Sequence, residues 1–575
     1  MSTASTKSRS HRKRKAEVAA SKTVAEPSSS SELSPGDVTE RTWLVSSFCI
    51  LAVAAFLRLY HLDLVPFHHD EGVNGNFLVR LVREGFYHYD PANYHGPTLY
   101  YFSAIIPWTL RFLFGVSAQN DYGLHTVTVR LVPALFGLAT VLLVLLLRRR
   151  LGTIGALSAA TLLAVSPGAV YLSRYYIHET LFVFFTLALV VAGLRYYEDG
   201  HPVYLILAAV SAALLFATKE TAMISAGVLL IALLLTAVYR WLRRKSAGAG
   251  QKRRKERSSQ RQVGTAQRPD VLQKYGGARM LAISVTGAVA LFVAVNVILY
   301  SSFFTNFPKG IYDALKTFEF WTKTGKAAHV HPFETYIWWL LKQESPVLVL
   351  GTIGAAFVVW KPRTSFALFS ALWAFGILAA YSLIPYKTPW LALNFIVPLA
   401  LIGGYALQVI YELGWRPQWL IAGVMVVAIG ISGYQTIALN FFNYDNDAQY
   451  YVYVYAHTRR ETLKLVYELD RIATRTGQGK QIGITIVSTD YWPLPWYLRE
   501  YGRVGYFGRM SNSTEPLIVA SEGQGAEMEA TFGERYQQVH SGLNAAGSYA
   551  LRPGVNLLLY ARRDALGTTS EKPPD

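Results

Sequence analysis

The chain has 575 residues, of which 52% are hydrophobic and 16% are charged. Such an apolar composition excludes a soluble protein of this size and indicates a membrane protein with many spans. The formal net charge of +18 would suit nucleic acid, but the basic residues gather at 7–15 and 240–279. Basic segments beside membrane spans orient the chain and attract anionic lipids. We therefore expect membrane lipids, and no nucleic acid, among the partners.

In chain order, the first predicted elements are a basic tail over 1–42, a span over about 43–59 and a loop over 60–125. The tail lacks the apolar stretch and the cleavage site of a secretory signal, and we expect it to be disordered and cytoplasmic. The span then takes the chain out of the cytoplasm, so the loop is predicted to be extracytoplasmic.

The apolar run 98–114 inside this loop decides the predicted topology. It is interrupted by Pro107 and Arg111 and is rich in aromatic residues, a composition typical of the membrane interface. If it crossed the membrane, the basic segments 148–150 and 240–279 would both face outward, against the positive-inside rule. We therefore predict an interfacial helix here and eleven crossings in total.

Eleven crossings predict a multi-pass protein of the cell membrane with a cytoplasmic N-terminus. Each apolar run is long enough to cross roughly 30 Å of hydrocarbon, and the basic segment 241–279 becomes a cytoplasmic loop. After the first span, the predicted crossings are about 127–147, 152–172, 180–197, 203–218, 221–240, 280–301, 345–360, 364–384, 391–411 and 418–440.

After the last crossing the composition becomes polar and mixed. Runs at 481–488, 517–520 and 556–561 are typical of strands, and 459–474 has the period of a helix. We predict that 441–575 forms a small α/β domain. The odd number of crossings places this domain outside the cytoplasm.

Ionisable residues cluster in the first loop, at His68-His69-Asp70-Glu71. Such groups are costly to hold near hydrocarbon, so a cluster of them indicates a reaction site. Asp70 and Glu71 begin a helix-like stretch and face different directions, so one can accept a proton while the other orients a partner or caps the helix. The alternative is that both only cap the helix. His68 and His69 are candidate ligands or acid–base groups, with a structural role as the alternative.

A second set of polar residues falls on the same predicted side of the membrane. Cations at the outer ends of spans suit a lipid phosphate, although a single cation there can simply snorkel. The chain has no Walker-type loop, nucleophile elbow or cysteine-based metal site, so a lipid-linked substrate is the simplest one. The set comprises His95, Arg130, Arg174, His178, Glu179, Lys219, Tyr386 and Lys387.

These residues resemble a known family. Asp70-Glu71 in the first loop, Arg130-Leu131-Val132-Pro133-Ala134 at the next span and Glu179 on the following outer turn are similar to the protein O-mannosyltransferase type of GT-C glycosyltransferase and to the aminoarabinose transferases. The full set is most similar to a prokaryotic subfamily described as associated with flippase activity in archaeal glycosylation. The resemblance covers about 43–440 and implies an all-α GT-C membrane domain of about eleven transmembrane helices with interfacial helices.

The resemblance also implies a reaction. The enzyme would move a sugar, mannose-like in the manner of its relatives, from polyprenyl phosphate to a protein or lipid acceptor outside the cytoplasm, with inversion. Asp70 would be the general base, and Glu71 and Glu179 would orient the acceptor or a metal. Lipid phosphate and sugar would be bound by His95, Arg130, Arg174, His178, Lys219, Tyr386 and Lys387.

One departure from the family concerns the phosphate. His95-Gly96 replaces a lysine that relatives often carry, and Lys387 could compensate for it. We expect no cofactor. A divalent metal is left open, because some relatives bind one, and His68 and His69 could then add ligands.

Two other functions remain open on the sequence. A transporter or flippase for lipid-linked sugars would place its ionisable groups near the middle of the membrane, whereas here they lie at the outer ends of the spans. A non-catalytic partner in glycan assembly would not need the acids at all. The position of the acids therefore favours an enzyme.

Overall fold

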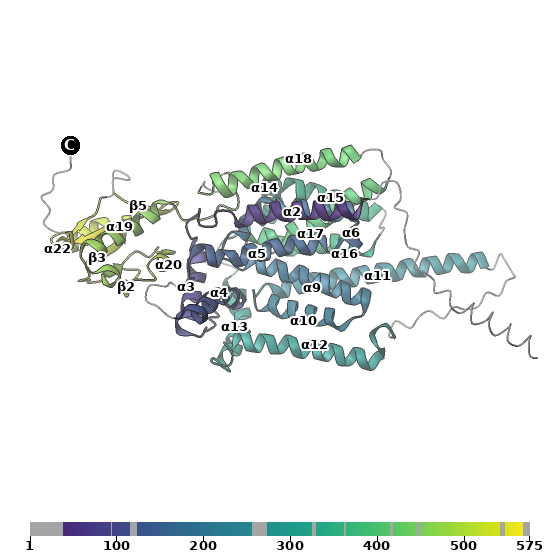
Figure 1. Cartoon of the computed structure of the whole chain (residues 1–575), viewed down its shortest axis with the longest axis horizontal. Helices are drawn as coiled ribbons and strands as arrows, with labels where there is room; N and C mark the ends of the chain where they lie inside the picture. The colour runs from purple at the N-terminus through teal and green to yellow at the C-terminus, as the bar shows by residue number, and fades with distance from the viewer. Residues whose placement is uncertain are drawn as a thin grey trace, which may run out of the picture. The chain divides into compact units, whose positions relative to one another are not determined.

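The computed structural model describes residues 38–93, 95–115, 123–255, 273–324, 329–360, 364–413, 418–445, 450–540 and 547–566 (Figure 1). Most of the predicted tail over 1–42, and 256–272 of the predicted cytoplasmic loop, lie outside these residues. Among the described residues, the regular elements up to residue 442 are helices, and the strands fall between residues 483 and 562. The predicted fold class, a polytopic helical protein with a small C-terminal mixed sheet, is confirmed.

A described helix lies over each predicted crossing, although not every one of these helices is long enough to span a membrane by itself. Eight are long and apolar enough to span a membrane, and two bent pairs raise that number to ten. The shorter apolar helix α10 occupies the remaining predicted crossing, while α4, with Pro107 inside it, is not one of these candidates. The helices are α2 (Glu40–Leu59), α3 (His69–Glu84), α4 (Thr98–Phe114), α5 (Thr126–Leu145), α6 (Arg148–Leu151), α7 (Thr153–Ala164), α8 (Pro167–Ser173), α9 (Glu179–Asp199), α10 (Pro202–Phe216), α11 (Ala222–Lys255), α12 (Gly277–Tyr300), α13 (Lys309–Thr324), α14 (Thr335–Gln343), α15 (Ser345–Trp360), α16 (Ser365–Leu383), α17 (Leu393–Glu412) and α18 (Gln418–Ile437).

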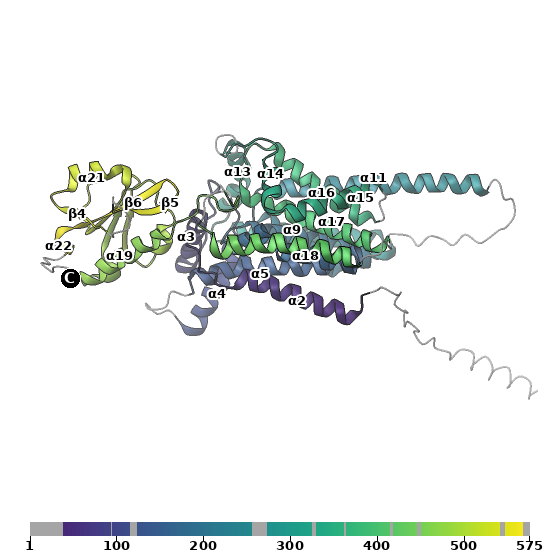
Figure 2. The same cartoon turned by 90° about the horizontal axis from the view of Figure 1, so that it is seen from above.

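Helix α17 forms the centre of the membrane part. In its spanning window 89% of the residues are buried, against none in α12, and it packs against α7, α15 and α16. Small residues allow these helices to approach closely. A Cβ atom at Gly354 would lie 2.0 Å from the carbonyl oxygen of Ile402, and one at Gly404 would lie 2.2 Å from that of Gly155. Figure 2 shows α9, α17 and α18 running roughly parallel to one another.

Helix α3 is defined by its caps. The His68 side chain accepts the backbone N–H of Asp70, and the Glu71 side chain accepts that of His68, which closes a capping box. At the other end Gly85 has a φ of 81°, the left-handed conformation that commonly ends a helix. These caps fix where the first turn of α3, and with it Asp70, begins.

The C-terminal sheet is mixed. Its order is β2-β1-β3-β6-β4, with β5 also paired to β6; β1 is parallel to β2 and β3, and the other pairs are antiparallel. The predicted helix and three strands are present, whereas β2, β4 and β5 had no sequence signal. The elements are α19 (Glu461–Arg475), β1 (Gly483–Ile486), α20 (Leu494–Tyr497), β2 (Arg503–Tyr506), β3 (Leu517–Ser521), α21 (Gly525–Phe532), β4 (Tyr536–Gln538), β5 (Tyr549–Arg552), β6 (Val555–Arg562) and α22 (Arg563–Leu566).

The segment around α20 packs directly on α3. A Cβ atom at Gly72 would lie 2.6 Å from Cβ of Pro493, and one at Gly75 would lie 2.6 Å from the Trp496 ring. Phe67 stacks on Trp496 with ring centroids 4.4 Å apart. Glycine at these two positions therefore lets the C-terminal region reach the turn of α3 that follows Asp70.

Candidate active site

A cavity of about 550 Å³ lies beside the first turn of α3. Its walls come from segments that are far apart in the sequence, including the loops before α4, α9 and α11 and the residues that follow α16. The charged, histidine and larger aromatic residues of its lining are three carboxylates (Asp70, Glu179 and Glu220), two cations (Lys219 and Arg552), five histidines (His68, His69, His95, His178 and His329) and four aromatic residues (Tyr381, Tyr386, Trp390 and Tyr455).

Asp70 is the lining carboxylate without a hydrogen-bond donor among the described residues. Its side chain is 44% exposed, and its nearest charged partner is His68, with Nδ1 3.9 Å from Oδ2. That Nδ1 already accepts the backbone N–H of Asp70 at 3.1 Å. Asp70 also lies in the first turn of α3, where the helix dipole favours a negative charge. The carboxylate is therefore available to accept a proton in the cavity.

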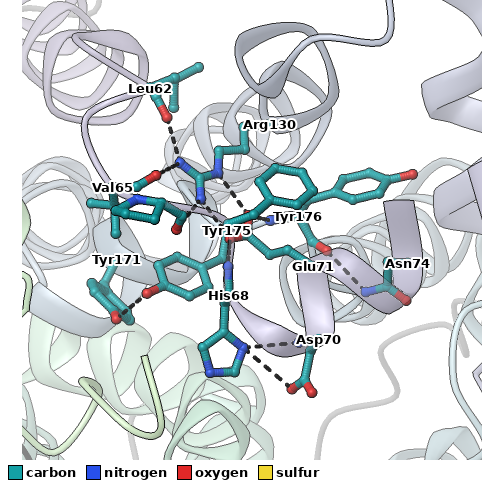
Figure 3. Close-up of polar contacts among 12 residues, drawn as sticks. Leu62, Val65, His68, Asp70, Glu71, Asn74, Arg130, Tyr171, Tyr175 and Tyr176 are labelled. Atoms are coloured by element: carbon teal, nitrogen blue, oxygen red, sulfur yellow. Dashed lines mark hydrogen bonds and ion pairs between the residues drawn. The ribbon is translucent and has the colours of Figure 1, made fainter. Parts of the chain in front are cut away.

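Glu71 lies on the opposite side of the same turn, and the protein uses both of its oxygens (Figure 3). Arg130 donates Nε to Oε1 at 2.7 Å and Nη2 to Oε2 at 2.6 Å. The backbone N–H groups of His68 and Tyr176 donate to the same carboxylate at 2.8 and 2.7 Å. Glu71 is fully buried and does not line the cavity, so its contacts are structural.

Arg130 and Arg174 both donate hydrogen bonds to backbone carbonyl groups. Arg130 donates to the carbonyls of three residues between Leu62 and Pro66, at 2.7, 2.8 and 3.2 Å. Arg174 donates to those of Leu57, Tyr60 and His61 at 3.2, 2.7 and 2.9 Å. Neither arginine lines the cavity. Together with Glu71 they hold the chain after α2 against α5 and α8, and we call these three residues the anchor cluster.

Lys387 is also bound to backbone. Its Nζ donates to the carbonyls of Ser382, Ile384 and His331 at 3.0, 2.6 and 3.3 Å, and the residue is 1% exposed. It thereby joins the segment after α16 to the loop before α14. The predicted contact of this ammonium group with a lipid phosphate does not fit that position, since Lys387 does not line the cavity.

Lys219 and Glu179 form an ion pair in the cavity wall, with Nζ 2.6 Å from Oε1. Burial alone lowers the pKa of Lys219, but Glu179 and Glu220 more than offset this and raise it. His95 is held beside them, because residues 95 and 219 pair as an isolated β-bridge. Its Nδ1 lies 3.3 Å from Oε2 of Glu220.

Gly96 allows this close contact. A Cβ atom there would lie 2.0 Å from the carbonyl oxygen of Ala217. At the position where relatives often carry a lysine, this chain thus has His95 in the cavity wall.

His178 completes this side of the cavity as a neutral imidazole. Its pKa is lowered well below the usual value by burial, and then by His95 and Lys219. Nε2 lies 3.1 Å from the carbonyl oxygen of Gly96 and donates to it. Nδ1 therefore carries the lone pair, and no described residue donates to it.

The facing wall is aromatic and was only partly predicted. The Tyr455 hydroxyl lies 2.8 Å from Nδ1 of His329, and Tyr386 packs edge-on against His329 at 5.4 Å between centroids. Trp390 contacts Tyr455 at 5.9 Å. Tyr386 is among the predicted site residues, and Trp390 follows in the same motif. Tyr455 ends the aromatic stretch 444–455, for which the sequence favours ordinary packing over a membrane-surface or sugar-stacking face. His329 and Arg552 lie in segments to which the sequence assigns no chemistry.

The histidines at 68 and 69 do not fit a metal site. Nδ1 of His68 accepts a backbone N–H, and its Nε2 lies 2.9 Å from the carbonyl oxygen of Tyr455. Nδ1 of His69 lies 3.3 Å from Arg552. Within the described residues, no three histidine, cysteine or acidic side chains gather as metal ligands would. We derive no step through a metal.

Comparison with known proteins shows which family model and which solved structures the chain is similar to. Residues 103–250 match the family model of dolichyl-phosphate-mannose-protein mannosyltransferases. The fold is similar to that of ArnT from Cupriavidus metallidurans bound to undecaprenyl phosphate, with 14% identity, 91% of this chain and 98% of that chain covered, and a TM-score of 0.57.

The same ArnT in the apo state gives 13% identity, 90% and 98% coverage and a TM-score of 0.54. At these identities the likeness concerns the fold. No curated protein sequence matches the chain. The match over residues 103–250 and the shared fold make the chain similar to membrane glycosyltransferases of the protein mannosyltransferase and ArnT type.

Proposed function

We propose that this enzyme transfers a hexose, mannose-like in the manner of its relatives, from polyprenyl phosphate to a hydroxyl group of an acceptor on the extracytoplasmic face. In a single displacement, the acceptor oxygen bonds to the anomeric carbon while the bond from that carbon to the phosphate oxygen breaks. The phosphate leaves with the electron pair, the hydroxyl proton goes to Asp70, and the anomeric centre is inverted.

The availability of Asp70 is the observation that carries this proposal. The other two lining carboxylates have cationic or imidazole partners, Glu179 with Lys219 and Glu220 with His95. A base must be free to reach the proton that it removes, and such help typically contributes 10²–10⁴-fold to a rate. The geometry therefore supports the role that the family resemblance implies for Asp70.

The leaving phosphate would bind at the side of the cavity that is formed by Lys219, His95 and His178. The Lys219 ammonium group lies in the wall as a buried cation, and cations stabilise the charge that grows on a departing phosphate. We propose this role for Lys219 in place of Arg130, Arg174 and Lys387. Glu179 holds Lys219 in position through their ion pair and is assigned no direct step.

The aromatic wall suits the transferred sugar. Aromatic rings present a partly negative face to which the C–H groups of a pyranose ring can pack, while their polar edges reach its hydroxyl groups. Trp390, Tyr455 and Tyr386 provide such surfaces, and His329 adds a polar edge beside Tyr455.

The test is sugar transfer by the Asp70→Asn variant of the full chain in nanodiscs. We expect transfer from labelled polyprenyl-phosphate hexoses to fall 10²–10⁴-fold, with the melting temperature unchanged because no hydrogen bond to the carboxylate is lost. Asp63→Asn is the matched control, since Asp63 is an exposed carboxylate in the same loop that does not line the cavity. Transfer at the wild-type rate by Asp70→Asn would exclude Asp70 as the base.

A further inference from the structure

Arg552 brings a cation from the C-terminal sheet into the cavity. It ends β5, at the tip of the β5–β6 hairpin, where Gly554 has a φ of 77°. The strand is pinned to α19, because the backbone N–H of Arg459 donates to the carbonyl of Leu551 at 2.9 Å, and the Thr462 hydroxyl donates to that of Ala550 at 3.1 Å. The guanidinium group is thus held by a rigid hairpin.

The contacts of Arg552 leave it able to bind a ligand. It forms an ion pair with Asp490 and donates Nη1 to Nδ1 of His69 at 3.3 Å. Two of its five N–H groups are therefore engaged by described residues. Asp490 does not line the cavity, whereas Arg552 does. The side chain is only 19% exposed, so its donors are largely screened from solvent.

The position of Arg552 associates it with the acceptor rather than with the donor phosphate. Its partner His69 immediately precedes Asp70, and the base must contact the hydroxyl group that attacks. The other lysine or arginine in the described lining, Lys219, is already paired with Glu179. A guanidinium fork beside the base is suited to a phosphate or a carboxylate.

We propose that Arg552 selects an acceptor that carries an anionic group, a phosphate or a carboxylate, close to its attacking hydroxyl. This inference rests on the proposed function and names the chemistry of the acceptor. The C-terminal sheet is then part of the acceptor site, and Arg552 is its specificity-determining residue.

The experiment compares variants of the full chain in nanodiscs, with labelled polyprenyl-phosphate hexoses as donor and a total extract of host membranes as acceptor pool. Arg552→Gln should raise the amount of pool needed for half-maximal transfer about 10- to 100-fold and leave the donor KM within about twofold. Arg552→Lys should restore part of the loss, because it keeps the charge but not the fork. Arg503→Gln, in an ion pair with Glu515 away from the cavity, should have no effect.

The Asp490→Asn variant tests whether Arg552 binds the acceptor or only forms a structural ion pair with Asp490. If Arg552 served only to pair with Asp490, the two variants would show the same loss; acceptor binding predicts that Asp490→Asn keeps most of the transfer. Phosphatase treatment or carbodiimide amidation of the pool identifies the anionic group, since one of them should abolish transfer.

The inference is wrong if neither treatment matters, if Asp490→Asn matches Arg552→Gln, or if Arg552→Gln changes the donor KM instead. Absence of transfer by the wild-type chain from every donor would instead overturn the proposed function.

Discussion

The anchor cluster and the cavity lie on two sides of one helical turn, yet they use the same residue types for different purposes. In the anchor cluster, Glu71 receives four hydrogen bonds and the two arginines donate to backbone carbonyls. In the cavity, Asp70 receives none on its carboxylate from the described residues. Charges that are satisfied by the protein hold the loop in place, and the charge left unsatisfied is the one available for chemistry.

The sharpest difference should appear in stability. Glu71→Gln leaves the Arg130 guanidinium group buried without its anion, which typically costs about 3–5 kcal/mol. We expect a large fall in the melting temperature and in the yield of monodisperse protein. Asp70→Asn, one residue away, is the matched control and should melt like the wild type. Equal melting temperatures for the two variants would remove the distinction between anchor and cavity.

The Lys219–Glu179 pair lies between these extremes, since it is buried and also lines the cavity. Lys219→Met leaves the Glu179 carboxylate without its cation and should cost about 2 kcal/mol. The double variant Lys219→Met/Glu179→Gln should recover much of that stability without recovering sugar transfer. Recovery of both would show that Lys219 serves only to neutralise Glu179.

The smallest effect concerns histidines that are buried in neutral form. Burial lowers the pKa of His457 to about 4, and it also lowers that of His69. Below pH 6.5 the unfolded chain takes up protons that the folded chain excludes, so stability falls as the pH falls. His457 should contribute up to about 1.4 kcal/mol per pH unit between pH 6.5 and 5.5.

Thermal melting across this pH range tests the effect. His457→Gln should make the melting temperature less dependent on pH, and His61→Gln, an exposed histidine, should leave the dependence unchanged. A pH dependence identical in all three proteins would contradict the assignment.

Hydrophobic runs were sufficient to predict the helical membrane fold, because span length is a local property of the sequence. The position of Asp70 in the first turn of α3 was also predictable, from the helix-like stretch that Asp70 and Glu71 begin. The group to which each cation binds was not predictable. Whether Arg174 binds a phosphate or a carbonyl depends on where residues 57–61 turn back, which its own neighbourhood in the sequence does not encode.

The role of Arg552 was also not predictable from the sequence. It comes from a strand with no sequence signal and lies 483 residues from its partner His69. No local pattern could connect the two, since the contact requires the whole sheet and its packing on α3. The contribution of His329 and Tyr455 to the aromatic wall was unpredictable for the same reason, whereas Tyr386 was among the predicted site residues.

The glycines of α3 have a consequence for how this protein can diversify. The first turn of the helix places Asp70 in the cavity. Gly72 in the same turn and Gly75 in the next contact Pro493 and Trp496. Helix α3 therefore packs against both the membrane helices and the C-terminal region, and its sequence must be compatible with both. A chimera that takes its C-terminal sheet from a relative must take α3 with it, and exchange of acceptor preference between relatives should follow the two segments together.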